Sequence, residues 1–417
     1  MYRCIWRQLV ILTTLLLLQR IIAITSAPSL KIRQLPNRVL IGYTSGHNYT
    51  KVKQSIVNDG VNVVIWSFID IVATPTTPNN TTLSSHNGHI RTNLDLQTIA
   101  TFINQLDNDG YSNIIHLTTF GGWNGPHLDT TLSAQQWYTI WQYSNVSKIF
   151  HGIDFDLEGN DNLTSTNNVF TIDCLNLMGS ISTLMNENGY IVSIAPPQSY
   201  LNINSTNFSR YVNISIPNRR WHSDFHYFGL NVYAYLLAKY GMYIDFISIQ
   251  LYESWSDAGM AIYHDGMKAS DYLYNFVHGL AVNNESFNVE FDHDPTLNMK
   301  AQNVSVPLSK LVIGLANGWA INNNPDSSSY HKALYVSGKE CEVAYRRLLN
   351  DHHVPRGFMY WTIEERGKND VYLAKDIGQF LFPNNTSKPN GHDNKKKKDS
   401  SNNNTILLVT EVRTITY

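Results

Sequence analysis

The sequence predicts a (β/α)8 barrel, a closed ring of eight parallel strands surrounded by helices. Eight short apolar runs alternate with eight helical patterns over about 345 of the 417 residues, and this alternation is typical of a parallel sheet. Eight repeats are the number that closes such a barrel. A doubly wound open sheet is the alternative, but no glycine-rich dinucleotide fingerprint follows any of the runs. We therefore expect one barrel domain over residues 37–383.

The expected strands are apolar runs bounded by Gly, Pro or polar residues, as is typical of strands buried on both faces. In chain order they cover residues 39–43, 61–69, 113–119, 150–160, 190–195, 245–252, 311–316 and 357–362. The expected helices cover residues 50–58, 94–106, 132–143, 169–188, 227–239, 267–282, 340–350 and 371–382. Gly60 and Gly189 end two of these helices, and Pro196 ends the fifth strand. We expect an irregular insertion up to Pro307.

The fourth strand carries three carboxylates, Asp154, Asp156 and Glu158, which alternate with apolar residues in the stretch F-H-G-I-D-F-D-L-E-G-N. Successive side chains of a strand point to opposite faces, so the carboxylates share one face at spacings of about 6.6 Å. Three ionised carboxylates would repel one another, and a shared proton relieves this repulsion. Such a proton can serve a general acid. The alternative is a solvated acidic face, but the flanking glycines and surrounding strands favour a buried site.

Other polar and aromatic residues stand where the predicted strands end. In a barrel of this kind the chemistry lies at the carboxyl ends of the strands. The candidate residues there are Tyr43, Thr119, Gly121, Gly122, Gln198, Gln250, Tyr252, Glu253 and Trp361. We expect them to surround the three carboxylates.

Several of these segments resemble one enzyme family. The run HGIDFDLE resembles the DxxDxDxE signature of family 18 glycoside hydrolases, the chitinases and their relatives, and TFGG at 119–122 is similar to the SxGG of that family. The segments IAPPQ at 194–198, QLY at 250–252 and MYW at 359–361 resemble those on its strands five, six and eight. The similarity extends from about residue 38 to residue 382.

The resemblance implies a retaining mechanism in which the substrate supplies its own nucleophile. Glu158 would be the general acid, and Asp156, backed by Asp154, would orient the 2-acetamido group of the sugar. Tyr252 would donate a hydrogen bond to the attacking carbonyl oxygen, and Trp361 would form the floor beneath the sugar. The other strand-end residues would contact the substrate. We also consider Trp123, Trp255 and Trp319 for further subsites, with loop packing as the alternative.

The sequence departs from the family pattern at three positions. His151 stands where the first Asp of the motif belongs, Thr119 replaces Ser, and Glu253 occupies a position where Asp or Asn is frequent. A His beside three carboxylates could gain a proton and weaken their repulsion. A structural role at the start of the strand is the favoured alternative.

Three functions are compatible with these residues. The first is a chitinase acting on chitin or chito-oligosaccharides, and the second is an endo-β-N-acetylglucosaminidase that uses the same carboxylates on N-glycans. The third is a carbohydrate-binding lectin on the same barrel, although lectin members typically lack the Glu that is present at 158. We predict no metal, because apart from His151 no His or Cys accompanies the acids at ligand spacing, and no cofactor. A net charge of −2 argues against a nucleic-acid partner, and we expect a monomer.

Both ends of the chain differ from the barrel. Residues 1–27 combine arginines, a short apolar run and small residues, which predicts a secretory signal peptide. A signal anchor is the alternative, but the apolar run is too short to span a membrane, so no stable membrane partner is expected. Acceptor sequons for N-glycosylation, such as those at Asn145 and Asn303, agree with export. Cys174 and Cys341 could pair or stay buried and free. Residues 384–417 form a polar tail that we expect to be disordered.

Overall fold

The computed structural model describes residues 34–74, 88–162, 164–212, 230–253, 256–321 and 333–383. The predicted signal peptide, the predicted disordered tail and Trp255 lie outside these ranges. Within the same ranges, no helix is both long enough and apolar enough to cross a membrane.

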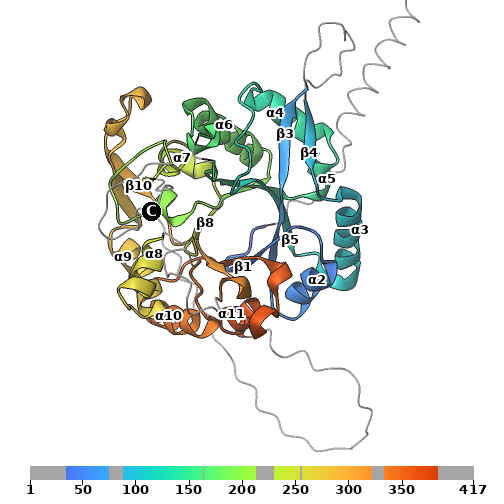
Figure 1. Cartoon of the computed structure of the whole chain (residues 1–417). Helices are drawn as coiled ribbons and strands as arrows, with labels where there is room; N and C mark the ends of the chain where they lie inside the picture. Colours follow the sequence, from blue (N-terminus) through green and yellow to red (C-terminus); the bar gives the residue numbers. More distant parts are fainter. Residues whose placement is uncertain are drawn as a thin grey trace, which may run out of the picture.

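Eight parallel strands close into a barrel, which confirms the predicted fold (Figure 1). Around the ring their order is β1, β2, β5, β6, β7, β8, β11 and β12, and β12 pairs back onto β1. Each strand overlaps its predicted run. The bounds are β1 (Val39–Thr44), β2 (Val63–Ser67), β5 (Ile115–Gly122), β6 (Gly152–Leu157), β7 (Ile191–Ile194), β8 (Phe246–Gln250), β11 (Leu311–Ala316) and β12 (Gly357–Trp361).

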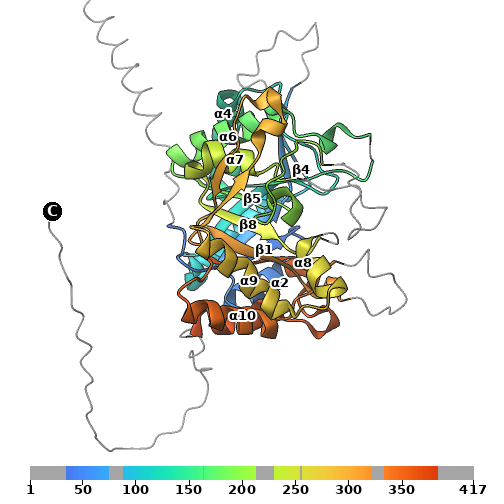
Figure 2. The same cartoon turned by 90° about the vertical axis from the view of Figure 1, so that its left-hand side faces the viewer.

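Helices surround the barrel in both views (Figures 1 and 2). All eight predicted helices are present, although the one expected at 227–239 begins only at Ala234. The shorter α5 and α8 add to them. The bounds are α2 (Tyr49–Val57), α3 (Leu96–Leu106), α4 (Ala134–Tyr143), α5 (Val146–Ile149), α6 (Ile172–Glu187), α7 (Ala234–Tyr240), α8 (Asp257–Gly259), α9 (Ala269–Val282), α10 (Gly338–Asn350) and α11 (Leu373–Leu381).

Two antiparallel hairpins interrupt the alternation of strands and helices. In the first, β3 (Ile69–Ala73) pairs with β4 (Gly88–Thr92) directly after β2. In the second, β9 (Ser286–Val289) pairs with β10 (Gln302–Ser305) inside the segment expected to be an irregular insertion. That expectation was therefore wrong for these two strands. Each has only four residues, two of them polar in β9 and three in β10, which is too short and too polar to give an apolar strand signal.

The apolar residues of the chain form two clusters, one between the strands and the helices and one inside the barrel. On β6, Ile153, Phe155 and Leu157 belong to the outer cluster. Because side chains alternate along a strand, the carboxylates between them face the barrel interior. Cys174 and Cys341 are each buried and unpaired, which answers the question left open by the sequence.

Candidate active site

Asp154 is the deepest of the three carboxylates and is completely buried. Its Oδ2 accepts hydrogen bonds from Tyr43 Oη and Thr119 Oγ1, both at 2.8 Å, and its Oδ1 accepts one from Ser193 Oγ at 2.6 Å. The strand register brings these partners together, because Thr119 and Ser193 lie opposite Asp154 on the two neighbouring strands. Burial raises the pKa of Asp154, and the three hydrogen bonds oppose that rise. Asp154 is thus held in place by donors on three other strands.

Asp156 and Glu158 form a connected pair above Asp154. Gln250 on β8 reaches both, because its Nε2 donates to Asp156 Oδ1 at 2.7 Å and lies 3.5 Å from Glu158 Oε1. The same nitrogen also donates to the carbonyl oxygen of Ala195 at 2.7 Å. Asp156 is buried, whereas Glu158 is half-buried. Gln250 therefore orients the carboxyl pair from β8, which is separated from β6 by β7.

The surroundings of this pair favour a bound proton. Burial, the charge of Glu158 and the charge of Asp154 hold the pKa of Asp156 well above its usual range. Burial raises the pKa of Glu158 to about 7, although hydrogen bonds with Asp156 and Gln250 oppose the rise. The two carboxyls interact directly, so the proton belongs to the pair. A carboxyl that still holds a proton near neutral pH can act as a general acid.

Aromatic side chains line the interior next to the pair. The Trp361 ring lies 5.6 Å from that of Tyr43 and 6.0 Å from that of Phe68, centroid to centroid. Tyr252 meets Trp319 edge-on at 6.3 Å, and Trp319 Nε1 donates to the carbonyl oxygen of Trp361 at 2.7 Å. Trp361 and Tyr252 are only partly buried, so both keep surface that a sugar could cover. These contacts place Trp319 at the site. The sequence alone had left open whether Trp319 forms a subsite or packs in a loop.

The two glycines after Thr119 are required by the packing of the protein itself. Gly121 has φ +97° and Gly122 has φ +82°, in the left-handed region that favours glycine. A Cβ at Gly121 would lie 2.6 Å from the carbonyl oxygen of Asp156, and one at Gly122 would lie 2.5 Å from the Phe68 ring. Gly121 therefore lets β5 approach β6 closely, and Gly122 leaves room for the Phe68 ring. Their contact with substrate stays a prediction.

Gln198 and Glu253 are both engaged with the protein. Gln198 is completely buried, donates through Nε2 to Tyr272 Oη at 2.7 Å, and accepts from the Ala258 amide at 2.9 Å. Glu253 accepts a hydrogen bond from the Ser199 amide at 2.9 Å, and burial raises its pKa to about 8. Gln198 thus ties β7 to helices α8 and α9. A direct role in substrate binding stays a prediction for both residues.

Trp123 stands at the outer edge of the site and is 41% exposed. Its Nε1 donates to Asp161 Oδ1 at 3.1 Å, which anchors the indole to the loop that follows Glu158. An anchored, partly exposed indole is suited to stacking on a sugar face. The predicted subsite role of Trp123 is compatible with this placement.

His151 lies at the opposite end of β6 from the carboxyl pair. Its Nδ1 accepts a hydrogen bond from the main-chain N–H of His116 at 2.9 Å, and the residue is 7% exposed. It therefore anchors the start of β6 to β5, as the structural interpretation of this residue predicted. Among the described residues, no group of three or more His, Cys, Asp and Glu side chains could hold a metal ion.

Several residues of the site were not predicted from the sequence. Phe68 belongs to no motif, and its place beside Trp361 depends on the fold. Ser193 could have been found, because it is the one polar residue in the run I-V-S-I and sits on the inward alternation of β7. His127, whose Nε2 lies 2.9 Å from the main-chain oxygen of Glu158, had no local signal.

No protein-family model matches the sequence, and no curated protein sequence matches it. Among solved structures, the chain is similar to a fungal endo-β-N-acetylglucosaminidase from glycosyl hydrolase family 18, with 14% identity, a TM-score of 0.49, and coverage of 84% of this chain and 100% of that chain. It is similar to a GH18 chitinase from Pseudoalteromonas aurantia (14% identity, TM-score 0.47, coverage 82% and 99%). A family 18 chitinase from Crocus vernus gives 17% identity, a TM-score of 0.46 and coverage of 82% and 99%.

Proposed function

We propose that this protein is a family 18 glycoside hydrolase, a secreted chitinase that cleaves β-1,4 linkages between N-acetylglucosamine units with retention of configuration. The observation that carries the proposal is the row Asp154, Asp156 and Glu158 inside the barrel, ending in a carboxyl whose pKa is raised to about 7. A lectin on the same barrel would need no such proton donor. The resemblance of the motifs then supplies the substrate class.

In this mechanism the substrate provides the nucleophile. The carbonyl oxygen of the 2-acetamido group attacks the anomeric carbon, and the bond from that carbon to the glycosidic oxygen breaks. Glu158 gives its proton to the departing oxygen, so the leaving sugar departs as a neutral alcohol. Water deprotonated by Glu158 then opens the oxazolinium ring and restores the acetamide, which returns the proton to the enzyme. The raised pKa of Glu158 suits both steps, because the carboxyl can be protonated or ionised near neutral pH.

Asp156 has the charge and the position to assist the attack. An ionised Asp156 accepts the acetamide N–H and stabilises the positive charge that develops on the oxazolinium ring. Gln250, at 2.7 Å, fixes the orientation of Asp156, and Asp154 lies beneath it. Tyr252 donates to the attacking oxygen, and burial together with nearby carboxylates keeps the pKa of Tyr252 raised, so the hydroxyl retains its proton. Trp361 provides a flat apolar surface for the sugar.

The predicted signal peptide at residues 1–27 supports a proposal about the biological setting. The predicted signal peptide would carry the protein out of the cell, where chitin or chito-oligosaccharides would be its partners. The sequons would then receive N-glycans. We propose that the enzyme acts as a monomer, because the carboxylates and the aromatic residues of the site all come from one chain. Recovery of protein that keeps residues 1–27 and stays in the membrane would contradict export.

The function is tested by hydrolysis of chitotetraose with wild type and Glu158→Gln. The glutamine keeps the shape of the side chain but cannot deliver a proton, so turnover should fall by about 10²–10⁴ while binding of the oligosaccharide is kept. A chain with free amines in place of acetamides at the cleavage site should resist the wild type, because it lacks the nucleophile. Near-normal turnover by Glu158→Gln, or equal cleavage of deacetylated chains, would rule the mechanism out.

Product analysis separates the chitinase from its two alternatives. Incubation with chitotetraose and, separately, with a high-mannose N-glycan shows which β-1,4 linkage is cut. Cleavage of the glycan core alone would assign an endo-β-N-acetylglucosaminidase with the same carboxylates. Tight binding of chitotetraose without any product would assign a lectin.

A further inference from the structure

The main chain around Glu158 is held by side chains where sheet pairing stops. Strand β6 ends at Leu157, and its last paired residue is Leu157 towards β5 and Phe155 towards β7. Glu158 and Gly159 therefore lie beyond the last residues of β6 that pair with the neighbouring strands. Peptide groups in such a position need other hydrogen-bond partners if they are to stay in place.

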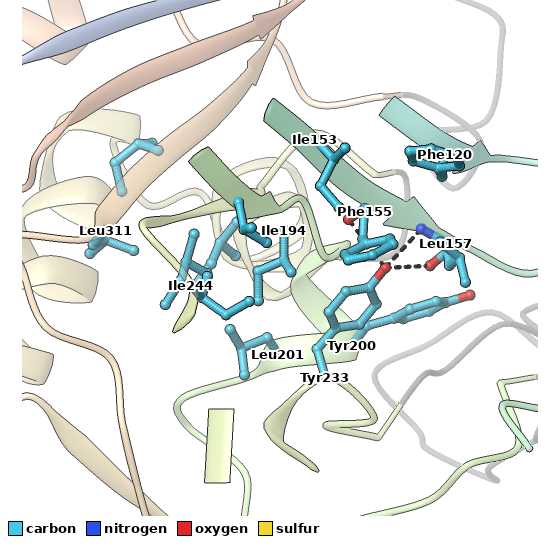
Figure 3. Packing of buried hydrophobic residues seen from close by; sticks show 14 of the residues in the cluster. Phe120, Ile153, Phe155, Leu157, Ile194, Tyr200, Leu201, Tyr233, Ile244 and Leu311 are labelled. Carbon is cyan, nitrogen blue, oxygen red and sulfur yellow. Dashed lines mark hydrogen bonds between the residues drawn. The ribbon is translucent and has the colours of Figure 1, made fainter. Parts of the chain in front are cut away.

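Three aromatic side chains supply partners to three consecutive residues. Tyr233 Oη accepts from the Leu157 N–H at 2.8 Å and donates to the Leu157 carbonyl oxygen at 2.9 Å. Tyr200 Oη accepts from the Gly159 N–H at 3.1 Å. His127 Nε2 lies 2.9 Å from the Glu158 carbonyl oxygen, and because a carbonyl only accepts, this nitrogen carries the proton. Figure 3 shows Tyr233 and Tyr200 side by side below the end of β6, with the bonds of Tyr233 dashed.

These three side chains share one packing partner, Phe170. The Phe170 ring lies 4.4 Å from the ring of His127, 6.1 Å from that of Tyr200 and 5.9 Å from that of Tyr233, and it meets both tyrosines edge-on. Phe170, Tyr200 and Tyr233 are almost completely buried. Edge-on aromatic pairs have a preferred geometry, so the shared ring limits how far each polar group can move.

Phe170 is in turn fixed by the loop after β7 and by the β9–β10 insertion. Its N–H donates to the Arg210 carbonyl at 2.8 Å, and Arg210 Nη1 donates back to the Phe170 carbonyl at 3.2 Å. The Arg210 guanidinium forms an ion pair with Asp294 at 2.6 Å, with side chains only 12% and 14% exposed. Asp294 lies between β9 and β10. Arg210 therefore connects this insertion to Phe170, which lies in the segment that follows Glu158.

We propose that Tyr233, Tyr200 and His127 are positioning residues for the general acid: they fix the peptide groups of residues 157–159 and thereby aim the Glu158 carboxyl. The inference rests on the proposed function of Glu158. It follows from geometry, because four hydrogen bonds of these three side chains go to the main chain at this one turn. Among the described residues, the Glu158 side chain is held by a 3.5 Å contact with Gln250 and a hydrogen bond with Asp156.

The test compares Tyr233→Phe and Tyr200→Phe with Tyr235→Phe as the matched control. Tyr235 is also buried and lies two residues after Tyr233, but its hydroxyl donates to Asn176 on α6 at 2.7 Å, away from Glu158. Each substitution removes one buried hydroxyl and keeps the ring. With chitotetraose, we expect kcat to fall roughly 10-fold in Tyr233→Phe and Tyr200→Phe with KM unchanged, because small misplacements of a catalytic group are costly. Tyr235→Phe should lower the melting temperature to a similar extent and leave kcat unchanged.

His127 gives a second, independent measurement. His127→Phe keeps a ring against Phe170 but removes the donor, so kcat should fall as in the tyrosine variants. His127→Gln places an amide N–H near the same position and should recover most of kcat. A His127→Phe protein that does not fold leaves the two tyrosine variants to decide.

Two results would overturn the inference without touching the proposed function. One is a kcat unchanged in both Tyr233→Phe and Tyr200→Phe while the melting temperature falls as in Tyr235→Phe. The other is a rise in KM alone. In both cases Glu158→Gln would still abolish turnover, whereas an active Glu158→Gln would refute the function itself.

Discussion

The two ends of the barrel surround their buried carboxylates with different charges. At the amino end, burial raises the pKa of Asp245, but the positive charges of Lys310 and Arg356 oppose that rise. At the carboxyl end, burial and the neighbouring negative charges raise the pKa of Asp156 together. Among the described residues, no Lys or Arg forms an ion pair with Asp156 or Glu158.

This difference distinguishes a carboxylate that holds the fold together from one that is suited to proton transfer. Asp245 Oδ2 accepts from the Val192 amide at 2.8 Å and from Asn186 Nδ2 at 3.3 Å, so it joins β7 and α6 to the start of β8. Nearby cations favour the ionised form of such a group and oppose the effect of burial on its pKa. Asp156 and Glu158 lack nearby positive charges among the described residues, and this favours a bound proton. Such an arrangement lowers the stability of the protein, as is common at functional sites.

The largest effect is expected when one carboxylate at each end is made neutral. Asp156→Asn should lower kcat on chitotetraose by roughly 100-fold or more, because it removes the charge that faces the developing oxazolinium. Asp245→Asn should instead lower the free energy of unfolding by about 1–3 kcal/mol, because a buried hydrogen-bonded charge is lost, and leave kcat within about 2-fold. Kinetics and urea unfolding of both variants provide the measurement. The comparison fails if Asp245→Asn is the catalytically impaired variant.

A second prediction concerns the pH dependence of the wild type. The pKa of Glu158 is raised to about 7, so the protonated acid is present below that pH and is lost above it. The kcat/KM for chitotetraose should therefore fall by about tenfold per pH unit above 7, because this parameter reports the free enzyme. A profile that stays flat to pH 9 would exclude Glu158 as the general acid.

A third experiment adds a positive charge beside the carboxyl pair, as Lys310 and Arg356 provide beside Asp245. Gln250→Lys places an ammonium group next to Asp156 and Glu158, and an opposite charge lowers the pKa of a carboxyl by about 1–3 units. The alkaline limb of the pH profile should move to lower pH by about one unit or more. Gln250→Met, which is of similar length and uncharged, is the control and should not move the limb downwards.

A smaller effect is expected on stability. The folded pKa of Glu158 is raised above the unfolded value of about 4.3. The contribution of this group is therefore most favourable at low pH and is lost as the pH rises towards 7. Glu158→Gln stays neutral, so its melting temperature should rise relative to the wild type between pH 4 and pH 7. A constant difference across this range would contradict the raised pKa.

The smallest effect is expected at His151. Its Nδ1 is engaged with the His116 N–H at the amino end of β6. His151→Asn offers an acceptor in a similar place, so kcat should stay within about 2-fold and the alkaline limb within about 0.3 pH units of the wild type, since the residue lies at the opposite end of β6 from the pair. A shifted limb would show that His151 communicates with the carboxylates.

The barrel was predictable because its strands are almost completely buried and most of them are therefore rich in apolar residues. The run Leu311–Ala316 was located to the residue. The hairpins were missed for the opposite reason, since β9 and β10 bury only alternate residues of very short segments. Packing of neighbouring elements, not local pattern, makes them strands.

The site was predictable where several of its residues lie on one strand. Asp154, Asp156 and Glu158 follow one another at the period of a strand, so their common face could be deduced. The supporting residues come from distant segments: Tyr233 reaches Leu157 across 76 residues, and Tyr43 reaches Asp154 across 111. Such contacts depend on the register of the whole ring and leave no periodic signal. For Gln198 the motif was recognisable from the sequence, but the contacts of its side chain were not. That side chain contacts α8 and α9.

The hydrogen bonds of Asp154 have a consequence for the order in which the protein becomes active. Its donors lie on β1, β5 and β7, and β1 is held between β2 and β12, the last strand of the chain. A growing polypeptide at roughly 5–20 residues per second cannot complete this arrangement until residues 357–361 have left the ribosome. The buried environment of Asp154 is therefore complete only at the end of synthesis, and under the proposed function an unfinished chain would have no hydrolase activity.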